Sequence, residues 1–252
     1  MRWAIAAVAA LSLAALSLPV FSISSWAADK KAKTDASQKV DSGSFGVFRK
    51  GQRVVTETFK IEQQNGISVI KAQVKETSGT DPASQKSDLE ITAGGELIRY
   101  EWSQSSGESL TVLPNNDFLI EKISTGAGGK TAEQPFLMPT TSPILDNNFF
   151  VHREVLLWRY LAADCKAEGG GLKCQQGPVE FGTLVPQDRT SMRVRVELVG
   201  KDKVPIHGTE RELLRINLTG ESFEWALWVD AQDQFKLMKV AIPADDTEVV
   251  RD

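Results

Sequence analysis

Histidine is scarce in this chain, and its scarcity limits the metal sites that the protein can build. The 252 residues include two histidines, His152 and His207. A three-histidine centre is therefore impossible, and neither histidine has a second one four positions away, as the helical zinc motif requires. A site with both histidines and one carboxylate, such as Glu210, remains an alternative. We expect no metal and no cofactor.

Motifs of common enzymes are also missing. No serine stands in the G-x-S-x-G pattern of hydrolases. The segment STGAGGKT, Ser124 to Thr131, ends like a phosphate-binding loop, but a serine occupies the position of its first glycine. Pro135, Pro139 and Pro143 follow and exclude the helix that such a loop requires. These absences favour a non-enzymatic protein. A hydrolase that assembles its catalytic group from distant residues is a further alternative.

Neither sign of charge dominates the sequence. The chain has 29 basic and 33 acidic residues, with a formal net charge of −4. Domains that bind nucleic acid carry a strongly basic surface, because they must neutralise phosphates. We therefore expect no nucleic-acid partner.

A long apolar run occurs at the N-terminus. Arg2 precedes it, and small residues around Ala27 follow it. This order is typical of a secretory signal peptide, so we expect residues 1–27 to be removed. The mature protein is then periplasmic or secreted and has no integral membrane span. An uncleaved anchor is the alternative, because the run approaches the roughly 18–20 apolar residues that cross a bilayer. Residues 28–44 lack an apolar pattern and are predicted to form a polar linker.

Two cysteines, Cys165 and Cys174, enclose a glycine-rich loop. In an exported protein, such a pair is expected to form a local disulfide. Its closure stabilises the fold by roughly 2–3 kcal/mol, because it restricts the unfolded chain. A free thiol nucleophile and half of a metal site are the alternatives. The loop follows an apolar segment, so the bridge is expected to fix the end of that segment.

From Gly43 onward, turn signals recur at the short intervals typical of antiparallel β proteins. Asn65-Gly66 and Gly94-Gly95 are expected two-residue hairpin turns. We predict a mainly β fold with about a dozen strands in a single domain, residues 45–252. A twisted open sheet rarely holds so many strands, so the sheet is expected to curl into an unclosed or closed barrel.

The strand FEWALWVD, residues 223–230, is apolar on both faces. Trp225, Leu227 and Val229 share one face, while Ala226 and Trp228 share the other. A strand with one wet face would alternate apolar and polar residues. We therefore expect another part of the protein to cover its second face.

Residues 148–162 are predicted to form a helix that is apolar on most of its circumference. Asn147 or Asn148 is expected to cap its N-terminus, with Asp146 favourable beside the positive end of the helix dipole. His152 and Arg159 lie seven residues apart, so they define a polar stripe that we place at a solvent-exposed rim. The neighbours of His152, Arg153 and Glu154, are expected to extend their charged ends to water. Such a helix is expected to lie as a plug across the mouth of the curled sheet.

Two hairpins resemble a known family. The segment FEWALWVDAQDQFKLMKVAIP, residues 223–243, resembles the last hairpin of the periplasmic lipoprotein-carrier family. The segment SFGVFRKGQRVVTETFKIEQ, residues 44–63, is similar to the opening hairpin of exported bacterial β proteins. The resemblance implies an unclosed barrel with helices over its cavity, which handles lipid or acyl chains without covalent chemistry. This chain has one clear helix and a cysteine pair instead of several helices, so no ligand residue is transferred by position.

We therefore predict an exported, non-enzymatic protein that holds a lipid or another hydrophobic small molecule in the cavity of a curled β-sheet. The expected ligand-binding residues are large apolar side chains of the helix and of the two-faced strand: Phe149, Phe150, Leu157, Trp158 and Trp228. The alternative is an envelope interaction or structural protein with a solid core, which contacts an envelope protein through edge strands or loops.

Overall fold

The computed structural model describes residues 37–77, 83–126, 129, 131–168 and 171–252. All of them belong to the unit Asp35–Asp252. Residues 1–27, which the sequence predicts as a signal peptide, lie outside the described residues. Within the described ranges, no helix has the length and apolar character needed to span a bilayer.

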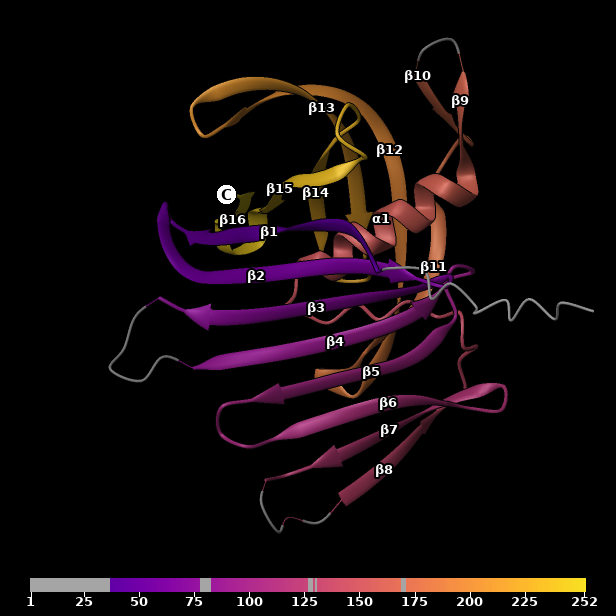
Figure 1. The fold of residues 1–252 in the computed structure, drawn as a ribbon. Coiled ribbons are helices and arrows are strands. Elements are labelled where there is room, and N and C mark those ends of the chain that lie inside the picture. Colours follow the sequence, from indigo (N-terminus) through magenta and orange to yellow (C-terminus); the bar gives the residue numbers. More distant parts are fainter. Residues whose placement is uncertain (1–36, 78–82, 127–128, 130, 169–170) are drawn as a thin grey trace, which may run out of the picture. The chain divides into compact units, whose positions relative to one another are not determined.

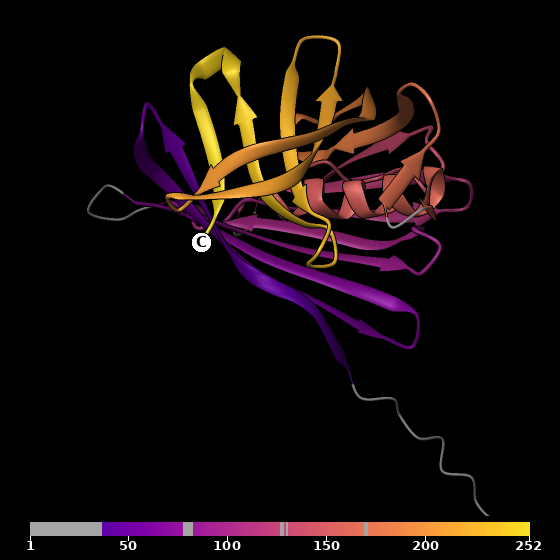
Figure 2. The same cartoon turned by 90° about the horizontal axis from the view of Figure 1, so that it is seen from above.

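Fourteen described strands form one antiparallel sheet, in the order β11-β12-β13-β14-β15-β16-β1-β2-β3-β4-β5-β6-β7-β8. Because β11 and β8 are its two edges, the sheet is not closed. It curls around the helix α1 (Figures 1 and 2). The mainly β fold with a curled, unclosed sheet and one apolar helix is confirmed. The strands are β1 (Gln38–Arg49), β2 (Gln52–Gln64), β3 (Ile67–Glu76), β4 (Ser84–Thr92), β5 (Leu97–Gln104), β6 (Ser109–Asn115), β7 (Phe118–Ser124), β8 (Thr131–Phe136), β11 (Val179–Val185), β12 (Thr190–Ile206), β13 (Thr209–Thr219), β14 (Glu224–Asp230), β15 (Lys236–Ile242) and β16 (Thr247–Arg251).

The turn between β2 and β3 lies at the residues that the sequence predicts. Asn65 and Gly66 connect β2 to β3, with φ angles of 52° and 76°. Positive φ at both central residues is the conformation that a tight hairpin needs, and asparagine and glycine adopt it at low cost. The register that follows from this turn places Ile61 opposite Ile70, and both side chains are buried.

The first strand extends into the segment that the sequence predicts as a linker. β1 begins at Gln38 and pairs with β2 from its first residue, where Gln38 lies opposite Gln63. Asp41 lies in this segment and is buried. The prediction of a polar linker over residues 28–44 is therefore wrong from Gln38 onward. The polar residues of this segment do not show the pattern of an ordinary strand, because Asp41 points inward and its carboxylate is paired inside the protein.

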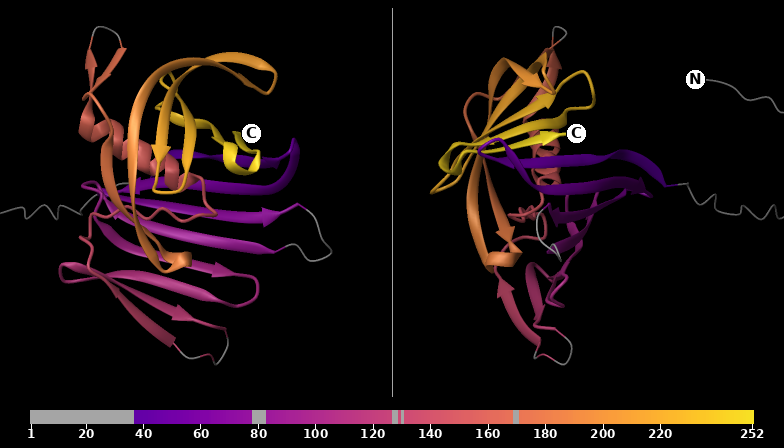
Figure 3. Two further views of the ribbon diagram at one scale, coloured as in Figure 1. Left: turned by 180° about the vertical axis from the view of Figure 1, so that it is seen from behind. Right: turned by 90° about the vertical axis from the view of Figure 1, so that its left-hand side faces the viewer.

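The long hairpin of β12 and β13 covers the second face of β14. The register between these strands shifts between Leu198 and Gly200, and beyond that point the hairpin bends over β14, β15 and β16 (Figure 3). Trp228 donates a hydrogen bond from Nε1 to Asp202 Oδ2 at 3.0 Å. It packs on a small second core of four buried residues, Val204, Ile206, Leu213 and Met238. The prediction that something covers this apolar face is confirmed.

The helix α1 (Val151–Asp164) begins later than the predicted residue 148. It is followed by a small hairpin of β9 (Cys165–Glu168) and β10 (Gly171–Cys174). The predicted disulfide between Cys165 and Cys174 is present and joins the two strands of this hairpin. The bridge therefore closes the chain directly after the last turn of α1.

A distant carboxylate caps α1, in place of the predicted asparagines. Glu57 of β2 accepts hydrogen bonds from the backbone N–H groups of Phe150 at 2.7 Å and Val151 at 3.2 Å. Burial raises the pKa of Glu57 to about 8. Asn147 and Asn148 bond to aspartate and glutamine side chains instead. The sheet thus fixes the start of the helix, since two unpaired N–H groups there need an acceptor.

Candidate ligand pocket

The two sides of α1 meet different surroundings. One side, which we call the packed side, faces β12 to β16, and the other, which we call the pocket side, faces β3 to β5. The packed side consists of Phe150, Glu154, Leu157 and Leu161, and all four are buried. The pocket side consists of His152, Val155, Arg159 and Ala162, and these line a cavity.

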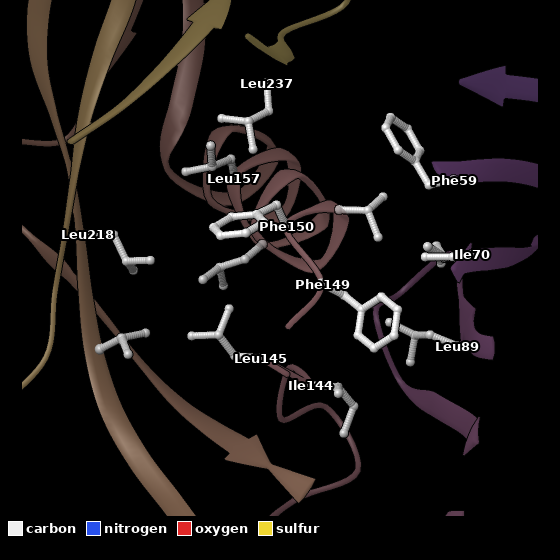
Figure 4. Packing of buried hydrophobic residues seen from close by; sticks show 14 of the residues in the cluster. Phe59, Ile70, Leu89, Ile144, Leu145, Phe149, Phe150, Leu157, Leu218 and Leu237 are labelled. Atoms are coloured by element: carbon white, nitrogen blue, oxygen red, sulfur yellow. The ribbon is translucent and has the colours of Figure 1, made fainter. Parts of the chain in front are cut away.

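Apolar contacts fill the packed side. Leu157 is fully buried beside Leu237 of β15 (Figure 4). The ring of Phe150 lies 6.4 Å from that of Trp225 on β14, measured between centroids. These residues belong to one large core that joins the helix to the sheet. The helix is therefore part of the hydrophobic core on this side.

An ion-paired cluster completes the packed side. Glu154 Oε2 accepts hydrogen bonds from the backbone N–H of Leu237 and from Arg251 Nη1, both at 3.0 Å. The guanidinium of Arg251 also donates to the carboxylate of Asp41. Burial, followed by the hydrogen bond with Asp41, holds the pKa of Glu154 well above its usual range. The prediction that Glu154 extends to water is wrong, because Arg251 pairs with it inside the protein.

Arg153 is also buried, contrary to the sequence prediction. Its Nη1 atom donates hydrogen bonds to the carbonyl oxygens of Phe149, at 2.8 Å, and Asp146. Burial lowers the pKa of Arg153 to about 10. The hydroxyl of Tyr100 donates to the carboxylate of Asp146, whose pKa burial raises to about 6. These bonds fix the chain that enters the helix.

The cavity on the pocket side has a volume of about 550 Å³. Its walls come from α1, from β4 and β5 with the turn between them, and from residues 142–144, which run beside the edge strand β11. The backbone N–H of Leu145 donates to Leu184 of β11 at 2.9 Å, which holds this segment in place. The apolar residues of the wall are Leu89, Ile91, Leu97, Pro143, Ile144, Val155, Leu156, Trp158 and several small residues.

The lining of this cavity contains few charged side chains. It contains one ionised side chain, Arg159, and the residues that line it include no aspartate or glutamate. The remaining polar groups are Gln63, Ser68, Thr92, Ser142 and His152. The cavity is therefore an apolar space with a single cation at one wall.

His152 forms the floor of the cavity and is not a rim residue. It is 1 % exposed, and its ring centroid lies 5.7 Å from that of Tyr100 and 5.6 Å from that of Phe149. Neither ring nitrogen has a hydrogen-bond partner among the described residues. Burial, followed by the charge of Arg153, lowers the pKa of His152 to about 3. The ring is neutral at pH 7, and the prediction of an exposed position is wrong.

The five predicted ligand residues do not line one common cavity. Phe149 and Leu157 are fully buried in the core. Phe150 lines a smaller cavity of about 330 Å³ near the start of the helix. Trp158 lines the cavity of 550 Å³ and donates a hydrogen bond from Nε1 to the carbonyl oxygen of Phe235 at 3.0 Å. Trp228 packs on the other face of the sheet.

A wider hollow of about 690 Å³ crosses β2 to β6. Its polar lining includes Lys71 and Asp88, whose side chains form an ion pair at 3.1 Å. Within the described ranges, no three His, Cys, Asp or Glu side chains are grouped closely enough to hold a metal ion. We take the cavity on the pocket side of α1 as the candidate site, because it combines mostly apolar walls with the unpartnered imidazole of His152 and with Arg159, a cation that has no ion-pair partner among the described residues.

Sequence reasoning missed the strand residues of this site. Leu89 and Ile91 alternate with polar residues in DLEIT, which marks them as inward-facing. That pattern cannot distinguish a residue that touches the helix from one that borders a cavity. Glu57 had a clearer signal, because it shares one face of its strand with Phe59 and Ile61. A carboxylate on an apolar face indicates a buried partner.

Three comparisons relate this chain to known proteins. No family model matches the sequence, and no curated protein matches it. Among solved structures, the chain is similar to a beta-barrel-like protein of the domain of unknown function DUF1849 from Brucella abortus. The alignment has a TM-score of 0.48 and 7 % sequence identity, and it covers 83 % of this chain and 93 % of that chain. The resemblance to lipoprotein carriers stays a prediction.

Proposed function

We propose that this is an exported, non-enzymatic binding protein that holds a lipid chain or another apolar small molecule in the cavity beside α1. The observation that carries the proposal is the cavity of about 550 Å³ on one side of α1, whereas Leu157 and Leu161 on the other side are buried in the core. Ligand pockets usually have volumes of about 300–1,000 Å³ and mostly apolar walls. The disulfide supports a periplasmic or secreted location, since such bonds persist in oxidising compartments.

The composition of the walls supplies a driving force for binding. Water in a space bounded by Leu89, Ile91, Leu97 and Leu156 finds few hydrogen-bond partners. An apolar ligand that replaces this water removes its own surface and that of the walls from solvent. Each square ångström of buried apolar surface contributes about 25 cal/mol. The cavity therefore favours a hydrocarbon chain or ring system over a polar metabolite.

A dye titration with a blocked variant tests this proposal. N-phenyl-1-naphthylamine is neutral and fluoresces when it enters an apolar site, so wild-type protein should enhance its emission in a saturable manner. Ala162 is exposed and lines the cavity, so Ala162→Trp should fill its entrance and abolish the signal without unfolding the protein. The matched control is Ala167→Trp on β9, which is exposed and does not line the cavity. Equal binding by all three proteins would refute the assignment of this cavity.

Protein purified from its own host gives an independent test. Native mass spectrometry and solvent extraction should release an apolar molecule from the wild type and much less from Ala162→Trp. A wild-type protein that carries nothing and binds no apolar probe would eliminate the binding function.

A second function is favoured by one surface feature. Leu137 directly follows the edge strand β8 and is 93 % exposed. An exposed apolar side chain beside a sheet edge suits contact with another protein. An envelope interaction protein with a mostly filled interior would use this edge. It becomes the leading function if no apolar ligand is found, and Leu137→Asp should then reduce binding to the envelope partner.

A further inference from the structure

The position of Arg159 indicates what kind of ligand the cavity accepts. Arg159 follows His152 by seven residues, so the two side chains share one face of α1 and are about 10 Å apart along the helix axis. His152 lies at the buried floor, whereas Arg159 is half-buried in the cavity wall. The guanidinium lies against the turn between β4 and β5, where a Cβ atom on Gly95 would be 3.5 Å from Nη1. The cavity thus has an apolar length with a cation at one end.

Arg159 has few protein partners for a half-buried cation. Its Nη1 atom donates to the carbonyl oxygen of Thr141, and its guanidinium carbon lies 5.8 Å from the centroid of the Phe181 ring. Within the described ranges, no carboxylate forms an ion pair with it. Arginine has five N–H donors, so most of its hydrogen-bonding capacity is unused. Removing such a group from water is unfavourable unless an anion or several acceptors compensate.

Another arginine inside the sheet shows the contrast. Arg251 binds the carboxylates of both Asp41 and Glu154. Each of its two Nη atoms thus has an acidic partner, and the planar guanidinium is well suited to bind acidic groups through several N–H donors. Arg159 has no acidic partner among the described residues, in a protein with more acidic than basic residues. Its free donors adjoin a cavity whose lining contains no carboxylate to repel an anion.

We propose that the ligand of this cavity carries an anionic headgroup, a carboxylate or a phosphate, which binds Arg159, while its apolar chain extends along the helix to the floor at His152. The proposal rests on the function proposed above and names its ligand class. The neutral imidazole suits the chain end, because it adds no charge to the apolar floor.

Three probes with the same alkyl chain test the headgroup: dodecanoate, dodecyl phosphate and dodecanol. Each is titrated against protein loaded with N-phenyl-1-naphthylamine, and the displacement gives its affinity. Hydrogen bonds to charged groups are strong enough that wild-type protein should bind at least one anion roughly ten to a hundred times more tightly than the alcohol. The anion that binds more tightly identifies the headgroup as carboxylate or phosphate.

Variants of Arg159 then connect the preference to the cavity. Arg159→Gln should reduce the preference for the anion over dodecanol to about twofold or less, mainly through weaker anion binding, while Arg159→Lys should keep part of this preference. The matched control is Arg193→Gln, which removes the same charge from a side chain that is 80 % exposed and lies outside the cavity. That control should behave as the wild type, because solvent screens its charge.

The outcomes separate this inference from the function on which it rests. Uptake of the dye and of dodecanol without any preference for anions would overturn the headgroup assignment and preserve the apolar site. An anion preference that survives in Arg159→Gln would also overturn it, since another group must then bind the headgroup. Failure of every probe, the dye included, would overturn both proposals. If Arg159→Gln does not fold, the partial loss in Arg159→Lys decides the matter.

Discussion

The packed side and the pocket side of α1 differ in how their charged and polar groups are paired. On the packed side, Glu154 Oε2 bonds to Arg251 and to a backbone N–H group, although Glu154 Oε1 has no partner among the described residues. On the pocket side, His152 has no hydrogen-bond partner among the described residues, and Arg159 has no carboxylate partner there. The first arrangement stabilises the fold, because the buried cation of Arg251 has two acidic partners, Asp41 and Glu154. The second arrangement gives up stability, which is typical of groups retained to bind something else.

The comparison also explains why one helix can serve two purposes. A helix of this length presents separate faces to separate surroundings. The packed side fixes the helix to β12 to β16, and its first N–H groups are held by Glu57 of β2. With the helix anchored on one side and at one end, its other side can border a cavity without loss of position. The cavity is therefore preorganised, which limits the entropy lost on binding.

The largest effect should come from the arginine of the packed side. Arg251→Met leaves the buried carboxylates of Asp41 and Glu154 without their main cation. Breaking a buried ion pair in this way costs about 3–5 kcal/mol. Denaturant melts at neutral pH should show this loss, with an unchanged dependence of the unfolding free energy on denaturant concentration if the unfolded state is unaffected.

The matched variant is Arg159→Met on the pocket side. This substitution removes a cation that has no ion-pair partner among the described residues, so the free energy of unfolding should change by less than about 1 kcal/mol. A loss as large as that of Arg251→Met would contradict the distinction between the two sides. It would show that Arg159 stabilises the fold directly.

Leucine and valine on opposite sides provide the next test. Leu157 is fully buried, and Leu157→Ala should lower the free energy of unfolding by about 2–5 kcal/mol, because a cavity is created in a filled core. Val155 is half-buried beside an existing cavity. Val155→Ala should therefore cost about 1 kcal/mol or less, since fewer packing contacts are lost. Chemical denaturation of both variants measures the difference, and equal losses would mean that the pocket side is also filled.

The same pair sharpens the functional comparison. Val155→Ala enlarges the cavity and should preserve dye binding. Leu157 does not line this cavity, so it should not contact the dye. Leu157→Ala should lower dye binding only to the extent that it unfolds the protein. Titrations carried out well below the unfolding transition separate these effects.

Much of the fold follows from local sequence patterns. Alternation in β2 and the turn at Asn65-Gly66 predict the strands, because hairpin register depends on adjacent residues. The sequence pattern does not predict the part of β1 that precedes residue 45. Asp41 in this part is buried because it pairs with Arg251, which lies near the opposite end of the chain. A pattern rule treats such a polar residue as exposed. Only the contacts between distant strands make it an interior residue.

The candidate site was harder to predict than the fold. The spacing of His152 and Arg159 correctly places them on one face of the helix, and the sequence interpretation assigned that face to solvent. The structure shows that the face lies toward β3 to β5 instead. Which side of an apolar helix borders a cavity depends on the curl of the sheet and on the anchor at Glu57. Neither is encoded in the periodicity of the helix itself.

The last prediction concerns His152 and depends on pH. The pKa of His152 in the folded protein is about 3, against an ordinary value of 6.5. Between these values the unfolded chain binds a proton that the folded protein does not, so the free energy of unfolding rises as pH increases through this window. The contribution of His152 to stability is complete above pH 6.5 and is lost as pH falls toward 3.

His152→Leu removes this dependence and the two unpartnered nitrogens together. At pH 7.5 the variant should match the wild type or exceed it by about 1 kcal/mol, because no buried polar group remains unsatisfied. At pH 5 the advantage of the variant should be larger by roughly 2 kcal/mol, since one pKa unit corresponds to 1.36 kcal/mol. Measuring the difference between the two proteins cancels the opposite trend from Glu57 and Asp146, whose pKa values are raised. If the difference in unfolding free energy between the two proteins stays constant from pH 7.5 to 5, the imidazole gains its proton in the folded protein as readily as in the unfolded chain. Solvent would then reach the floor of the cavity, and the pocket side would be a wet cleft instead of an apolar site.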